Sequence, residues 1–208
     1  MSVLDIRPLL WRDGWPAAGE NVQAGTYEIE SARTGTALEL AVQGVPVGGF
    51  RGRGGRGAGA NPGAPPAPTA APIPAQDASQ VSSNWPSGPA DVRMSAYLLQ
   101  AQQKWTIAPV ANVGGYPGSP FFKITIAGTD RTLAATEDRE LIALPAFTGA
   151  PEQLWRIDQL ADGSYCLMPK TVPRSREPLA LSAVGSSMPT LERFNPESDR
   201  QRWNLRTP

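Results

Sequence analysis

Large apolar residues recur at a regular interval in the second half of the chain. Three tryptophans lie 50 and then 48 residues apart, and each stands two residues after a glutamine and two before an isoleucine or leucine. The three segments are Gln103–Ile107, Gln153–Ile157 and Gln201–Leu205. Because alternate residues of a strand point to one face, each segment predicts a β-strand with the glutamine, the tryptophan and the aliphatic residue on the same side. A period near 50 residues predicts copies of one supersecondary unit that bury a shared core together.

Shorter alternating runs precede each of these segments. They predict strands at 27–30 and 37–42 in the first copy, 122–126 and 132–134 in the second, and 165–168 and 179–181 in the third. Turn residues separate the runs and no helical period is sustained, which predicts an all-β, barrel-like fold. Each glutamine is polar beside a buried ring, so its amide is expected to bond the backbone of a nearby turn.

The three Gln-x-Trp motifs resemble those of the ricin B-type lectins, the family-13-like carbohydrate-binding modules. That resemblance implies a β-trefoil fold whose core motif here is Gln103, Trp105, Gln153, Trp155, Gln201 and Trp203. It covers residues 22–43 and 91–208, so residues 22–208 are interpreted as one β-trefoil domain that carries a loop insertion.

The insertion interrupts the first copy. Residues 44–75 contain 9 Gly, 7 Pro and 7 Ala among 32 positions, too little apolar surface to offset the entropy of ordering the chain. We expect residues 44–75 to be disordered or extended, as a Gly/Pro/Ala-rich part of a loop insertion at 44–90 that lies within the first repeat rather than between domains. Its Arg51–Gly57 run is similar to the Arg-Gly segments of RNA-binding proteins, but three arginines give only a weak electrostatic signal.

The first 21 residues form a separate segment. The run Arg7–Pro16, with its Arg-Pro-x-x-Trp and Asp-Gly-Trp-Pro elements, resembles the end of the propeller catalytic domain of family 43 glycoside hydrolases, which act on arabinan and related polysaccharides. This resemblance implies a hydrolase catalytic domain in cis, whose own carboxylates are absent from this chain. The alternative is an N-terminal strand that packs locally on the trefoil.

Composition narrows the function classes. The chain has 19 basic and 19 acidic residues, so no general attraction to nucleic acid or to an anionic membrane is expected. No apolar run reaches the length of a membrane span, and the N-terminus lacks the apolar stretch of a signal peptide. As part of a longer hydrolase, the protein is expected to be extracellular or periplasmic, and monomeric.

No catalytic, cofactor or metal site is predicted. The chain has no histidine, which removes the common triads and the commonest metal ligand. Glu137, Asp138 and Glu140 could in principle supply paired carboxylates, but a solvated turn is the better interpretation. Cys166 is the single cysteine, so it cannot form an intramolecular disulfide and is interpreted as a small core hydrophobe.

The lectin resemblance implies a sugar site in the first copy. There an acid in the Leu-x-Leu strand, an aromatic ring and an amide before the Gln-x-Trp motif would bind the sugar. Glu39 fills the acid position, Gln102 the amide position, and Tyr97 or Trp85 supplies the stacking ring. These residues are the candidate carbohydrate-binding set.

The other two copies depart from that pattern. The second has Leu133-Ala134-Ala135 without an acid, and Glu152 replaces the amide. The third has Leu179-Ala180-Leu181, again without an acid, and Arg200 precedes its motif. At most one ricin-like site is therefore expected.

The leading hypothesis is a carbohydrate-binding module that serves as the C-terminal accessory of a hydrolase acting on arabinan or hemicellulose. Its partner would be a plant-type polysaccharide, or a glycan that contains galactose or arabinose. Two alternatives stay open: a structural trefoil that supports the propeller without binding sugar, and an interaction protein acting through its Arg-Gly loop.

Overall fold

The computed structural model describes the backbone of Leu9–Arg12 and Trp15–Ala18, and residues 22–42, 78, 82–116, 119–185 and 188–208. Among these residues, strands dominate, and short 3-10 turns join several of them. The Arg-Gly run and most of the predicted insertion lie outside the described residues.

The described strands after residue 21 fall into three sets of four, which we call repeats one, two and three. Repeat one has β3 (Gly25–Ser31), β4 (Ala37–Leu40), β5 (Ala90–Ser95) and β6 (Trp105–Tyr116). Repeat two has β7 (Ser119–Ile126), β8 (Thr132–Ala135), β9 (Leu141–Leu144) and β10 (Trp155–Gln159). Repeat three has β11 (Tyr165–Pro169), β12 (Leu179–Val184), β13 (Met188–Arg193) and β14 (Trp203–Arg206).

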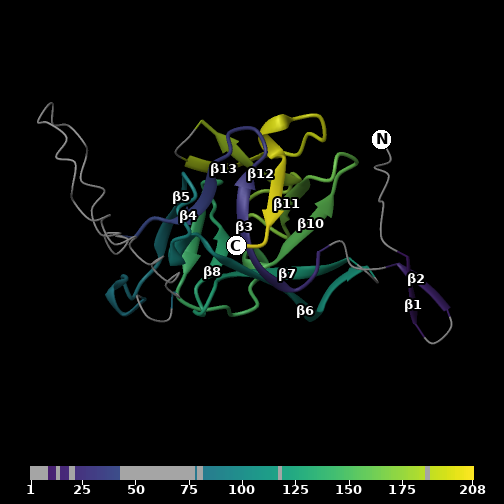
Figure 1. The fold of residues 1–208 in the computed structure, drawn as a ribbon, viewed down its shortest axis with the longest axis horizontal. Helices are drawn as coiled ribbons and strands as arrows, with labels where there is room; N and C mark the ends of the chain where they lie inside the picture. The colour runs from purple at the N-terminus through teal and green to yellow at the C-terminus, as the bar shows by residue number, and fades with distance from the viewer. Residues whose placement is uncertain are drawn as a thin grey trace, which may run out of the picture.

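The first and fourth strands of each repeat close a six-stranded antiparallel barrel. Its pairs run β3–β6, β6–β7, β7–β10, β10–β11, β11–β14 and β14–β3, so the ring has no free edge. The second and third strands pair as the hairpins β4–β5, β8–β9 and β12–β13. Figure 1 shows the barrel strands in the middle of the molecule, with β4–β5 to the left of them and β12–β13 above them. The all-β, barrel-like prediction is confirmed.

Three tryptophans build the centre of the core. Trp105, Trp155 and Trp203 are each 0% exposed. Fully burying a ring of this size removes about 200 Å² from water, which stabilises the fold by on the order of 5 kcal/mol per ring as an upper limit. Ile107 and Ile157 are buried with them, as the alternation predicts.

The tryptophans also show which positions of the three repeats are equivalent. Each indole N–H donates to a leucine carbonyl oxygen in the second strand of its own repeat. The donor–acceptor distances are 2.8 Å from Trp105 to Leu38, 3.0 Å from Trp155 to Leu133 and 2.9 Å from Trp203 to Leu181. Leu38, Leu133 and Leu181 are therefore the same position of the repeat.

The glutamines bond the backbone of nearby turns, as predicted. Each side-chain oxygen accepts a backbone N–H, from Leu98 at 2.8 Å, Thr148 at 2.7 Å and Asn195 at 2.8 Å. Each side-chain nitrogen donates to a carbonyl earlier in the same turn, that of Ala96 at 2.7 Å, Ala146 at 3.0 Å and Arg193 at 3.0 Å. One side chain thus fixes both ends of the loop before each barrel strand.

The prediction that the three glutamines lie on the barrel strands was wrong. Gln103, Gln153 and Gln201 end the 3-10 turns η2 (Ala101–Gln103), η3 (Pro151–Gln153) and η4 (Asp199–Gln201), and each strand begins only at the tryptophan. The Gln-x-Trp spacing therefore spans a turn-to-strand junction. The turn lets the amide reach backward to its loop while the ring points into the barrel.

The insertion lies inside repeat one, between β4 and β5. These strands are separated by residues 41–89, whereas only residues 136–140 separate β8 from β9 and 185–187 separate β12 from β13. The connection ends at residue 89 rather than 90, because Ala90 already pairs with Ala143 as the first residue of β5. The described end of the connection includes the 3-10 turn η1 (Ser82–Asn84).

The N-terminal segment contains a separate hairpin. The strands β1 (Leu9–Arg12) and β2 (Trp15–Ala18) pair antiparallel with each other, and no other described strand joins their sheet. Most of the remaining N-terminal residues lie outside the described part of the chain.

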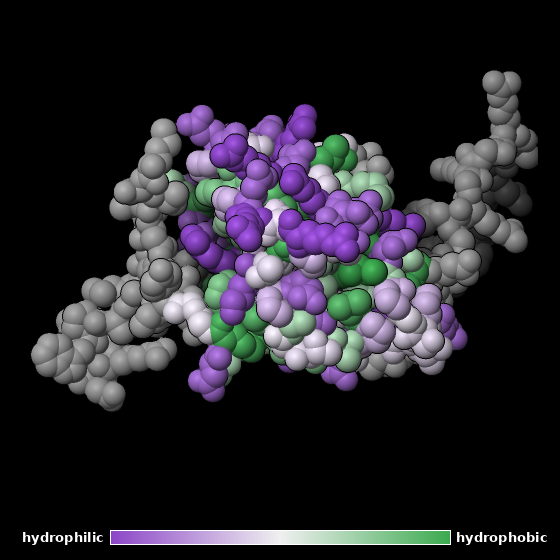
Figure 2. Space-filling view, turned by 180° about the vertical axis from the view of Figure 1, so that it is seen from behind, coloured by the Kyte–Doolittle hydropathy of each residue, from purple (hydrophilic) through white to green (hydrophobic). Residues whose placement is uncertain are grey.

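The large hydrophobic residues exposed in the described part of the chain are Leu98, Leu99, Val184 and Met188. Figure 2 shows a face on which hydrophilic residues gather and apolar residues form only small, interrupted patches. Cys166 is buried, as the alternation predicts. Among the described residues, none of the helical segments is long and apolar enough to cross a membrane.

Candidate functional site

Glu39 lies on β4 and faces Arg93 across the β4–β5 hairpin. The two residues are register partners, so their side chains emerge side by side on one face. The Arg93 Nε donates to Glu39 Oε1 at 2.9 Å, and a second guanidinium nitrogen bonds the same oxygen. The Glu39 side chain is only 4% exposed while that of Arg93 is 49% exposed. The pair therefore presents the guanidinium, and not the carboxylate, to solvent.

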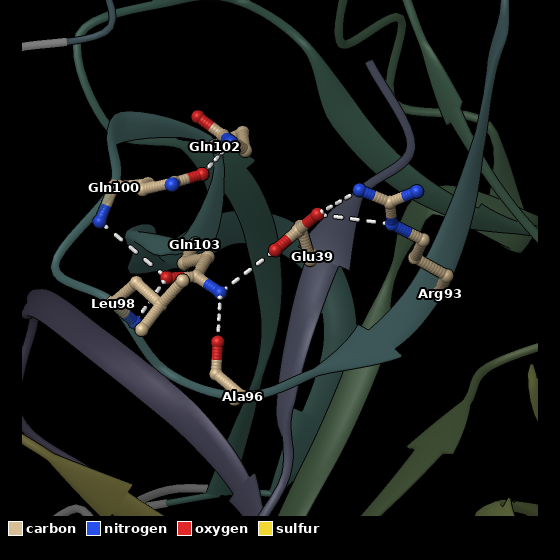
Figure 3. A network of polar contacts seen from close by, with 7 residues as sticks. All are labelled: Glu39, Arg93, Ala96, Leu98, Gln100, Gln102 and Gln103. Atoms are coloured by element: carbon tan, nitrogen blue, oxygen red, sulfur yellow. Dashed lines mark hydrogen bonds and ion pairs between the residues drawn. The ribbon is translucent and has the colours of Figure 1, made fainter. Parts of the chain in front are cut away.

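Gln103 joins the same network from the other side. Its amide nitrogen donates to Glu39 Oε2 at 2.7 Å in addition to its bond to the Ala96 carbonyl. Both carboxylate oxygens of Glu39 are thus engaged within the protein. Figure 3 shows Gln103 between Glu39 and the loop that carries Leu98, with Arg93 on the opposite side of Glu39. We call Glu39, Arg93, Gln100, Gln102 and Gln103 the repeat-one network.

Gln102 is also enclosed. It is 3% exposed, and its amide nitrogen donates to the side-chain oxygen of Gln100. Gln100 is the residue before η2, and its backbone N–H lies 3.4 Å from the Gln103 side-chain oxygen. The structure brings the predicted Glu39 and Gln102 into one corner of the fold, but neither is open to a ligand as the prediction required.

Equivalent positions in the other repeats carry no charge. Counting from the leucines that accept the indole bonds, Glu39 and Arg93 correspond to Ala134 and Ile142 in repeat two. In repeat three they correspond to Ser182 and Thr190, which are also register partners. The charged pair is therefore specific to repeat one.

The predicted alignment of repeat three was wrong by two residues. Leu181-Ser182-Ala183, and not Leu179-Ala180-Leu181, matches Leu38-Glu39-Leu40. The two registers cannot be told apart by pattern, because leucines at both 179 and 181 fit the alternation. Ser182 is buried and donates to Glu192 Oε2 at 2.7 Å.

Trp85 does not provide a stacking ring. It is 8% exposed and packs in the hydrophobic core. The segment that follows it is held by Arg131, which donates to the carbonyl oxygen of Gly88 at 2.9 Å and to that of Pro86. Burial lowers the pKa of the Arg131 guanidinium. Trp85 and Arg131 together tie the end of the insertion to the body of the fold.

Tyr97 is half-buried, with its hydroxyl turned into the protein. No hydrogen-bond partner for that hydroxyl is found among the described residues. Burial raises the pKa of the Tyr97 hydroxyl, and the charge of Glu28 raises it further. Tyr97 thus makes no side-chain bond to the repeat-one network in the described part of the chain.

Two leucines form an exposed edge beside the network. Leu98 is 61% exposed and Leu99 is 55% exposed, in the loop that Gln103 fixes. Sequence reasoning missed these residues, and it also missed Arg93. The signal for Arg93 was available, because β5 alternates buried apolar with exposed charged residues opposite the acid of β4.

The turn with three carboxylates shows no catalytic arrangement. Glu137, Asp138 and Glu140 are all exposed in the turn between β8 and β9, and Glu137 pairs with Arg174 at 3.0 Å. Within the described residues, no three His, Cys, Asp or Glu side chains are grouped as metal ligands.

No protein-family model matches the chain, and no curated protein sequence matches it. Solved structures do match this chain. A designed threefold-symmetric protein, ThreeFoil, has 15% identity and a TM-score of 0.53, over 88% of this chain and 98% of that one.

The fold is a β-trefoil.

Two further β-trefoil matches are parts of longer chains. A mosquitocidal holotoxin matches with 13% identity and a TM-score of 0.56, over 89% of this chain. A Polyporus squamosus lectin bound to a sialylated glycan epitope matches with 14% identity and a TM-score of 0.52, over 88% of this chain. The β-trefoil chain spans only 17% of the holotoxin and 49% of the lectin.

Proposed function

We propose that this β-trefoil is a carbohydrate-binding module whose sugar site is the solvent side of the repeat-one network. The observation that carries the proposal is the position of the Glu39–Arg93 pair. Burying a carboxylate is costly even when it is paired, and the same fold position takes Ala134 with Ile142 or Ser182 with Thr190. Packing of the trefoil does not require the charges, so they have another use.

Arg93 has the chemistry for a hydroxyl ligand. Its guanidinium offers planar, paired N–H donors, and about half of the side chain faces solvent. Glu39 holds this donor plane in place through two bonds to one carboxylate oxygen. A fixed donor lowers the entropy lost when vicinal hydroxyls of a sugar bind.

The apolar part of such a site comes from Leu98 and Leu99 rather than from an aromatic ring. Both leucines are more than half exposed. Figure 3 shows Leu98 beside Gln103, on the other side of Glu39 from Arg93. The C–H face of a sugar ring would pack on them while its hydroxyls reach the polar residues. The solved lectin that shares the fold binds a glycan, which supports the same class of ligand here.

The proposal extends to the context of the domain. The resemblance of Arg7–Pro16 to the end of a family 43 hydrolase supports an accessory role in a longer, exported enzyme acting on arabinan or hemicellulose. The β-trefoil matches within the holotoxin and the lectin also lie in longer chains. Held beside a catalytic domain, the module would raise the effective concentration of polysaccharide at that domain.

A second candidate is a structural trefoil that binds no sugar. One observation favours it: both oxygens of Glu39 are already engaged by Arg93 and Gln103. In this case the repeat-one network stiffens the β4–β5 hairpin and nothing more.

Affinity electrophoresis separates the two. The double substitution Glu39→Ala with Arg93→Ile installs the pair that repeat two already tolerates, so the variant is expected to fold. Retardation of the wild type by arabinan, galactan or xylan that is lost in this variant supports the sugar site. A folded wild type that none of these polysaccharides retards would overturn it and favour the structural role.

A further inference from the structure

A groove lined by residues of repeats two and three shares no residue with the repeat-one network. It lies between β7, β10, β11 and the loop that joins β11 to β12, and its volume is about 420 Å³. Its lining includes Phe121, Arg156, Met168, Lys170, Ser175 and Arg176. Sites for small ligands usually range over about 300–1,000 Å³, so one or two sugar rings fit.

The groove depends on a loop that is longer in repeat three than in its copies. Residues 170–178 join β11 to β12, which makes nine residues. The equivalent connections are residues 32–36 in repeat one and 127–131 in repeat two, five residues each. The extra length forms one wall of the groove, and neither of the other repeats has it.

The β6–β7 ribbon contributes to the opposite wall. Residues 105–116 of β6 run far beyond the four or five residues of β10 and β14, with an irregularity between Val110 and Gly115. The Lys170 Nζ donates to the Val113 carbonyl oxygen across this gap. The same Nζ lies 4.9 Å from the centre of the Phe121 ring. The Lys170 ammonium is therefore held at the groove by both contacts.

The charges that line the groove are not balanced. Arg156 pairs with Asp158 on its own strand, at 2.9 Å from Nε to Oδ1, and Glu177 pairs with Arg139 at 3.6 Å. Lys170 and Arg176 have no carboxylate partner among the described residues. Since the whole chain has no net charge, this excess of positive charge is local.

We propose that this groove binds a carboxylate-bearing sugar, a hexuronate unit of an acidic polysaccharide. Lys170 and Arg176 take the carboxylate, and Phe121 with Met168 forms the apolar wall against which the ring lies. A peptide carboxylate lacks the ring that this wall fits. The inference rests on the proposed carbohydrate-binding function and adds a second ligand class at a separate place on the trefoil.

The test is retention on polygalacturonate compared with neutral galactan, measured by affinity electrophoresis of the whole chain. Lys170→Gln removes the charge and keeps an N–H donor for the Val113 carbonyl, and Arg176→Gln removes the second cation. Together they are expected to weaken retention on polygalacturonate at least tenfold. The matched control is Arg174→Gln, because Arg174 lies on the same loop, is 82% exposed and does not line the groove.

The outcomes separate this inference from the function on which it rests. Support requires that Lys170→Gln/Arg176→Gln loses polygalacturonate but keeps neutral-glycan retention, and that Glu39→Ala/Arg93→Ile does the reverse. Neutral-glycan binding without polygalacturonate binding overturns the groove alone. An equal loss in Arg174→Gln, or equal binding of poly-glutamate, shows charge attraction without a sugar site and also overturns it. If no glycan of either kind binds, both proposals fail.

Discussion

Leu99 adopts the left-handed backbone conformation that Gly149 adopts at the equivalent position of the next repeat. Their φ angles are 58° and 81°, and each follows the residue whose N–H bonds the motif glutamine. A leucine in this conformation costs roughly 1–2 kcal/mol, which glycine avoids. Repeat one therefore has an exposed leucine beside the repeat-one network, in a backbone conformation that is unfavourable for leucine.

Leu99→Gly is expected to stabilise the protein by about 0.5 kcal/mol. The relief of the left-handed conformation exceeds the added entropy of the unfolded chain, and little buried surface is lost because Leu99 is 55% exposed. Urea denaturation measures the change. Leu98→Gly is the control, since Leu98 has no positive φ and its replacement should lower stability by about 0.5–1 kcal/mol. A loss of stability in Leu99→Gly would show that the left-handed backbone conformation of Leu99 is not strained.

Tyr97→Phe is expected to raise the free energy of unfolding by about 1 kcal/mol. The Tyr97 hydroxyl is buried without a partner among the described residues, and an unsatisfied buried hydroxyl costs about 1–3 kcal/mol. The ring itself stays in place. Thermal unfolding of the two proteins under one condition checks this, and an unchanged or lower midpoint in the variant would show that the hydroxyl is bonded.

Glu28→Gln is expected to stabilise the protein at neutral pH and to have no such effect in acid. Burial raises the pKa of the Glu28 carboxyl above its ordinary value of 4.5, and the neighbouring Glu30 raises it further. Above the folded-state pKa, the charged carboxyl therefore disfavours folding. As pH falls through that pKa the folded protein takes up the proton, and below about 4.5 the cost is gone.

The measurement is urea denaturation of wild type and variant between pH 4 and pH 8. The advantage of Glu28→Gln should be constant above the folded-state pKa of Glu28 and shrink as the pH falls through that pKa toward 4.5. An advantage that grows as the pH falls would mean that the folded protein prefers the charged form of Glu28.

Cys166 is expected to resist thiol reagents while the protein is folded. Burial raises the pKa of the Cys166 thiol to about 12, and the side chain is 1% exposed. The thiolate that reacts is therefore both scarce and inaccessible at pH 8. Labelling with a chromogenic disulfide should be slow in buffer and fast in denaturant; fast labelling in buffer would show that β11 opens locally.

The sequence predicted the fold because the Gln-x-Trp motif does the packing. Trp105, Trp155 and Trp203 fill the barrel, and their regular spacing can be recognised in the sequence alone. The sequence pattern did not predict the 3-10 turns, because an i, i+2 spacing is the same within a strand as across a turn-to-strand junction. The indole bonds that set the register of repeat three are likewise tertiary contacts, which alternation alone does not contain.

The candidate site was predicted in part. Glu39 and Gln102 do lie in one network, but Arg93 and Gln103 engage the carboxylate of Glu39 and Gln100 engages the amide of Gln102, contacts that the strand pattern does not reveal. Trp85 follows a Gly/Pro-rich run that suggested exposure, yet it packs in the core next to the segment held by Arg131. Burial of a single ring depends on neighbours that are distant in sequence.

The most direct measurement of the proposed sugar site is an NMR titration of the isotopically labelled protein with arabinan- and galactan-derived oligosaccharides. The side-chain N–H signals of Arg93 and Gln103 report on the site, and those of Gln153 and Gln201 serve as internal controls at the same repeat position. We predict that the Arg93 and Gln103 signals shift with a saturating dependence on sugar, while the two control signals stay unchanged. Shifts of equal size in all three glutamines, or none in Arg93, would contradict binding at the repeat-one network.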